Sequence, residues 1–88
     1  MVVSKLVEIE RKESHIYYMQ DFTATAVYSI VGKEKTGKIR FSIEHKPTGE
    51  MVITLFILDD VDYPLLPIII DLKKMIKNMV ETNLILLD

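Results

Sequence analysis

The sequence contains no cysteine and no tryptophan, and it has only three glycines and three prolines among 88 residues. The absence of cysteine excludes disulfides, thiolate catalysis and cysteine-ligated zinc, and a secreted domain of this size would usually carry such cross-links. The longest apolar runs, such as LLPIII at 65–70, fall far below the roughly 18 residues of a membrane span. We therefore expect a cytoplasmic protein with no membrane association.

An excess of one charge sign is also lacking. The formal net charge is −2 and the isoelectric point is about 5.6, so no overall attraction to nucleic acid or anionic lipid is expected. Apolar character is abundant instead, with 49% hydrophobic residues and a mean hydropathy of +0.21. A chain this short forms one domain, residues 1–88, and buries only about 60–65% of its unfolded surface. Part of its apolar surface is therefore expected to be covered by another chain.

Four segments carry the apolar patterns of β-strands. Residues 2–13 alternate, which places Val3, Val7 and Ile9 on one face, and residues 15–31 form a long strand with one apolar face. After an interruption at 32–37, residues 38–45 alternate again, and the proline and glycine of KPTGE at 46–50 predict a turn. Residues 51–58 differ because both faces are apolar, and a strand of this kind is normally covered on both faces.

The period changes to three and four after residue 64, which predicts an amphipathic helix. We expect it to begin between Asp62 and Ile68 and to end near Asn83. The side chains expected to be buried are Leu65, Ile69, Leu72, Ile76 and Met79. Residues 84–87, LILL, are either a short fifth strand or an apolar tail. The predicted fold class is α+β, a mainly antiparallel four-stranded β-meander with one C-terminal helix packed on one face.

One stretch resembles a phosphate-binding loop. GKEKTGK at 32–38 has the glycine and lysine spacing of a P-loop, but Ile39 stands where the magnesium-binding hydroxyl belongs. The alternation of residues 38–45 also predicts a strand where a P-loop needs a helix N-terminus. We interpret the stretch as a hairpin connection with a positive φ at Gly32 or Gly37, and we expect no nucleotide and no other cofactor.

The chemically active residue types are sparse. Asp59, Asp60 and Asp62 precede the predicted helix, where they would serve either as oxygen ligands for Mg²⁺ or Ca²⁺ or as helix N-caps. We favour the cap, and we predict no metal site and no catalytic residue. The two histidines, His15 and His45, lie at strand ends and belong to no catalytic motif.

A local basic patch provides an alternative to a purely protein-binding role. The third strand and its flanking turns, residues 33–46, carry five cations that would contact nucleic acid if they shared one sheet face. These are Lys33, Lys35, Lys38, Arg40 and Lys46. The competing interpretation is a solvated hairpin whose lysines protect an exposed sheet edge. The negative net charge disfavours nucleic acid as a partner.

The hypothesis that fits these patterns best is a non-catalytic, cytoplasmic, homo-oligomeric interaction or regulatory module. Its partner is a second copy of the chain in a homodimer, or another protein. The expected interface residues are Val52, Phe56 and Leu58, because they form a second apolar face on the fourth strand. A nucleic-acid-binding domain that uses the basic hairpin is the alternative. A small enzyme with its site at a subunit interface is the third hypothesis.

Overall fold

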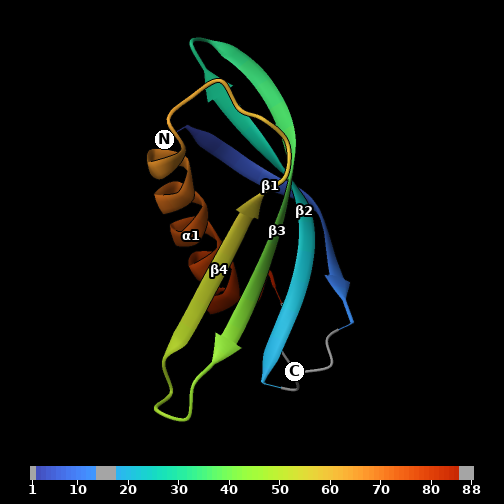
Figure 1. The fold of residues 1–88 in the computed structure, drawn as a ribbon, viewed down its shortest axis with the longest axis vertical. Helices are drawn as coiled ribbons and strands as arrows, with labels where there is room; N and C mark the ends of the chain where they lie inside the picture. The colour runs from blue at the N-terminus through green and yellow to red at the C-terminus, as the bar shows by residue number, and fades with distance from the viewer. Residues whose placement is uncertain (1, 14–17, 86–88) are drawn as a thin grey trace.

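The computed structural model describes residues 2–13 and 18–85, and it shows four strands followed by one helix. The elements are β1 (Val3–Lys12), β2 (Met19–Ile30), β3 (Lys33–His45), β4 (Met51–Ile57) and α1 (Leu65–Glu81). The strands form one antiparallel sheet in the order β1-β2-β3-β4, as Figure 1 shows. The predicted α+β meander is confirmed. Residues 84 and 85 form no strand, and the rest of the predicted fifth strand lies outside the described residues.

The β2–β3 hairpin is longer and more tightly connected than predicted. The two strands pair without interruption over their whole length, so only Val31 and Gly32 form the turn. Both have positive φ angles, 50° and 71°, as a two-residue type I′ turn requires. Gly32 therefore has the predicted backbone conformation. The predicted connection over 32–37 is wrong in extent, because residues 33–37 belong to β3.

Gly37 lies inside β3 because the ring of Tyr28 packs over it. A Cβ atom at position 37 would lie 3.2 Å from Cε2 of Tyr28 and 3.6 Å from Cβ of Asp59. An aromatic ring over a strand glycine fills the space that the missing side chain leaves. The glycine that suggested a phosphate-binding loop is thus a packing position. Strand β3 continues to His45, where such a loop would need a helix.

Strand β1 contains two irregularities that its alternation pattern did not reveal. The register with β2 shifts between Val3 and Lys5 and again between Val7 and Glu10. Each shift turns the following side chains to the opposite face of the sheet. Leu6 is therefore buried, and Val7 pairs on the outer face instead of sharing the inner face with Val3, as predicted.

Helix α1 packs on the inner face of the sheet through a stripe of residues four apart. Ile68, Leu72 and Ile76 are completely buried. Ile69 and Met79 are only half-buried, and Leu65, which was predicted to be buried, is 52% exposed. The prediction for Leu65 is wrong because the first turn of α1 projects beyond the buried stripe, which begins at Ile68.

The two ends of α1 are closed by different means. At the C-terminal end, Asn83 has a φ of 61° and the amide of Leu84 donates to the carbonyl of Met79 at 2.8 Å. This is the Schellman arrangement, and it agrees with the predicted role of Asn83. At the N-terminal end the cap is Pro64, which offers no side-chain hydrogen bond. The predicted aspartate cap is therefore wrong: Asp59 Oδ2 instead accepts from the backbone N–H of Lys38 at 2.8 Å.

The sheet curves around the helix. The α1 backbone approaches the two edge strands, β1 and β4, more closely than it approaches the central strands (Figure 1). At the β1 edge, the amide of Val2 donates to Asp71 Oδ2 at 3.1 Å. Between the edges, the rings of Phe22 and Phe41 stack with their centroids 5.0 Å apart. One hydrophobic cluster thus joins the helix to all four strands. No helix among residues 2–13 and 18–85 is long and apolar enough to cross a membrane.

Candidate functional site

The edge strand β1 carries several features that discourage pairing with another chain. It holds two register irregularities, and Glu8 lies at the second of them with a φ of 53°. The bulge directs the Glu8 carboxylate across the outer face, where it accepts from Thr25 Oγ1 at 3.2 Å and lies 3.9 Å from Lys38 Nζ. Charged residues continue along the strand to Lys12. Bulges and edge charges are the usual means by which proteins block edge-to-edge pairing.

Strand β4, at the opposite edge, has none of these features among its seven residues. It contains no charge, proline or glycine, and its pairing with β3 has no register shift. The amide of Leu58 donates to the carbonyl of Lys38, and that of Lys46 donates to the carbonyl of Glu50. Because hydrogen-bonded pairs alternate along an antiparallel ladder, the even-numbered residues of β4 bond to β3. The amides and carbonyls of the odd-numbered residues, such as Ile53 and Leu55, therefore point to the open edge.

The predicted interface residues lie on the outer face of this edge. Phe56 is 46% exposed and Leu58 is 55% exposed, whereas Val52 is half-buried. The Arg40 guanidinium lies 5.0 Å from the centre of the Phe56 ring, which holds the ring against the sheet in a cation–π contact. The structure thus brings the three predicted residues onto one strand edge, and it leaves their apolar surface in water within a single copy of the chain.

A basic groove runs beside the first half of β4. It has a volume of about 480 Å³ and lies between the β3–β4 turn, β4 and α1. Its apolar floor comes from Met51, Val52 and Ile53. Its rim carries four lysines and one carboxylate, namely Lys46, Lys73, Lys74, Lys77 and Glu50. We call this feature the lysine groove. The helical lysines were not predicted as site residues, because only the packing of α1 beside β4 brings them to Lys46.

The other end of β4 is acidic. The segment 58–64, which leads from β4 to α1, carries Asp59, Asp60 and Asp62, and we call it the aspartate loop. Beyond it, the first turns of α1 leave Leu66 68% exposed and Ile70 45% exposed. The edge thus has a basic end, an apolar middle and an acidic end. Unpartnered apolar surface of this kind on a small domain is typical of an interaction site.

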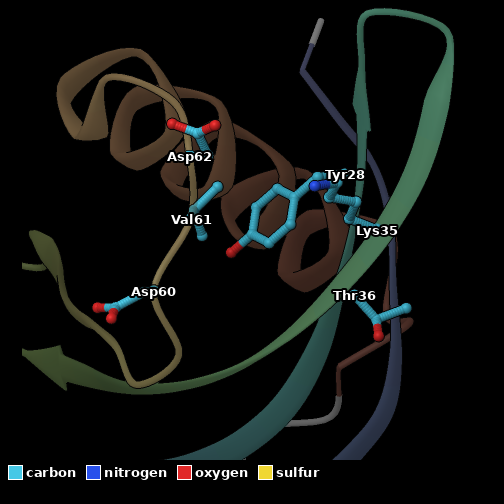
Figure 2. A pocket seen from close by; sticks show the side chains of 6 residues that line it. All are labelled: Tyr28, Lys35, Thr36, Asp60, Val61 and Asp62. Carbon is cyan, nitrogen blue, oxygen red and sulfur yellow. The ribbon is translucent and has the colours of Figure 1, made fainter.

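A cleft of about 410 Å³ lies behind the aspartate loop, and Figure 2 shows its lining. The ring of Tyr28 stands between β3 and the loop with its hydroxyl directed toward the loop, while the Asp60 carboxylate points away from it (Figure 2). The Tyr28 hydroxyl is buried and has no hydrogen-bond partner among the described residues. Burial, with a smaller contribution from the Asp59 carboxylate, raises the pKa of Tyr28. The phenol therefore stays protonated at neutral pH and is unsuited to act as a base or nucleophile.

The remaining candidate residues do not assemble into one site. By strand alternation, Lys33 and Lys35 lie on the inner side of β3, while Lys38 and Arg40 lie on the outer side. Lys46 belongs to the lysine groove, so the five predicted cations do not share a face. His45 pairs with Met51 at one end of β4, and the aspartate loop begins at the other end. In the part of the chain that the structure describes, no cluster of three metal-ligating side chains is present.

Comparison with known proteins identifies one family. The model of the BB_0187 family matches residues 1–81 of the 88-residue chain, a span that includes all four strands and α1. No curated protein and no solved structure matches the chain.

Proposed function

We propose a function for this chain, which belongs to the family whose model matches residues 1–81: it acts as a non-catalytic, homodimeric interaction or regulatory module. The observation that supports this proposal best is the difference between the two sheet edges. One edge is bulged and charged, and the other is regular, apolar and open. The cytoplasm is the compartment we propose, because a cysteine-free domain of this size suits a reducing environment.

The energetics favour a partner at β4. Phe56 and Leu58 are each about half exposed on the free chain, and both extend from a strand with unpaired backbone groups. Fully burying a side chain of this size contributes roughly 1.5–3 kcal/mol. Even partial burial at several positions is then large beside the about 5–15 kcal/mol stability of a small domain.

Light scattering coupled to size-exclusion chromatography tests the proposal. At micromolar concentration we expect a species of twice the 10.2 kDa chain mass. Phe56→Glu should place a charge in the interface and shift the protein to monomer, with a dissociation constant raised at least about 100-fold. Val31→Glu is the matched control, because Val31 is 94% exposed at the hairpin tip and far from β4. A monomeric wild-type chain, or two variants that behave alike, would contradict the proposal.

A further inference from the structure

The β4 edge has the chemistry to recognise another copy of itself in one register. Resting on the proposed homodimer, we propose that two copies join by antiparallel pairing of β4 with the partner's β4, on a twofold axis at Thr54. The two sheets then become one continuous eight-stranded sheet, with both helices on the same face. The occupant of the open edge is therefore a second copy of this chain rather than an unrelated strand.

The register follows from the direction of the backbone groups. The open edge presents the amides and carbonyls of odd-numbered residues, so hydrogen-bonded pairs between copies must join odd to odd. A twofold axis at Thr54 places Met51 opposite the partner's Ile57, and Ile53 opposite the partner's Leu55. This arrangement uses every residue of β4 from Met51 to Ile57. A shift by two residues in either direction leaves one end of the strand without a paired strand residue.

The same register matches the side chains on the outer face. Val52 comes opposite the partner's Phe56, and Thr54 comes opposite the partner's Thr54. An aromatic side chain beside a β-branched one is a favourable cross-strand pair, and so is threonine beside threonine. The exposed part of the Phe56 ring is thus covered by the partner's Val52, while its Arg40 contact remains in place.

Charge complementarity fixes the antiparallel direction. Within one chain, the lysine groove lies beside the first residues of β4, and the aspartate loop follows its last residue. A twofold axis exchanges the two ends, so the lysine groove of each copy lies beside the partner's aspartate loop. Parallel pairing would set lysine beside lysine and aspartate beside aspartate. Electrostatics of this kind selects the orientation and register of an interface more than it sets the affinity.

Cysteine cross-linking measures this register directly, because the natural chain contains no cysteine. Thr54 pairs with its own copy at a non-hydrogen-bonded position, where Cα atoms lie about 4.5 Å apart, within the range of a disulfide. Thr54→Cys should form a covalent dimer within minutes in a glutathione redox buffer. Thr48→Cys, in the exposed β3–β4 turn, is the control and should remain monomeric on a denaturing gel.

A second pair of variants distinguishes this register from its neighbours. Val52→Cys and Phe56→Cys should each cross-link poorly alone, and they should cross-link efficiently when the two proteins are mixed. A homodimer by light scattering without the Thr54→Cys disulfide would overturn this inference and leave the proposed homodimer intact. Efficient cross-linking of Val52→Cys alone would also overturn it, since it indicates a different axis. A monomeric chain would overturn both proposals.

Discussion

The two edges of the sheet face the same helix and share the same core, yet they are built in opposite ways. β1 has ten residues, two register shifts, a left-handed Glu8 and a row of charges. β4 has seven residues in unbroken register, and none of them is charged. If edge protection served only to prevent aggregation, both edges would need it. The difference indicates that β1 is kept apart from other chains and that β4 is kept available for one.

The largest effect should come from the core that both edges share. Leu72 is completely buried on α1, and Leu72→Ala should lower the free energy of unfolding by about 2–5 kcal/mol. Lys74→Ala, an exposed position on the same helix, should change it by less than about 0.5 kcal/mol. Urea denaturation at a fixed protein concentration measures both. Equal losses would mean that the assigned buried face of α1 is wrong.

The next effect is on the charged ends of the β4 edge. The double variant Lys74→Glu, Lys77→Glu should weaken the dimer about tenfold at low salt, since each exposed pair contributes up to about 1 kcal/mol. The same double charge reversal on the β1 edge, Lys5→Glu with Lys12→Glu, should leave dimerisation unchanged. Sedimentation equilibrium measures both dissociation constants, and raising the salt concentration should reduce the difference. An equal response at the two edges would remove the contrast between them.

A backbone prediction tests whether the β1 bulge is a strained, protective device. Glu8 has a φ of 53°, so Glu8→Gly should stabilise the fold by about 0.5–1 kcal/mol, despite losing the exposed contact to Thr25. Glu10→Gly, two residues further along the same strand, should destabilise it by about 0.5–1 kcal/mol. Thermal melts of the two variants should therefore shift in opposite directions. Two shifts of the same sign would argue against strain at Glu8.

The smallest effect concerns Tyr28, which packs behind the aspartate loop. Because its buried hydroxyl has no partner among the described residues, Tyr28→Phe should change stability at pH 7 by no more than about 0.5 kcal/mol. The raised pKa of Tyr28 in the folded chain means that its contribution is present below the unfolded pKa of about 10 and is lost as pH rises through the folded pKa. The wild-type protein should therefore lose more stability than Tyr28→Phe between pH 9 and 11, as melts at both pH values would show.

The sequence predicted the elements that local periodicity determines and missed those that depend on neighbours. The alternation around Phe22 and Phe41 and the four-residue spacing of Leu72 and Ile76 led to the correct strands, helix and α+β class. The bulges of β1 were missed, because a bulge changes which face a residue occupies without changing its residue type. The glycine at 37 was taken for a loop, since the ring that requires it comes from another strand.

The candidate site followed the same division. Phe56 and Leu58 were found from the apolar second face of β4, a local pattern. Lys73 and Lys77 were assigned only to the solvent face of a helix, because their proximity to Lys46 arises from the fold. Periodicity also could not show that β4 is an edge strand. Its two apolar faces predicted a strand covered on both sides, and in the single chain its outer face is open.

Amide hydrogen exchange at two protein concentrations tests the contrast between the edges most directly. The account predicts that the amides of Ile53 and Leu55, which point to the open edge, exchange rapidly in dilute protein and slow down as the dimer forms. The amides of β1 should exchange at the same rate at both concentrations. Exchange at Ile53 and Leu55 that does not depend on concentration, or slowing at β1 instead, would contradict the account.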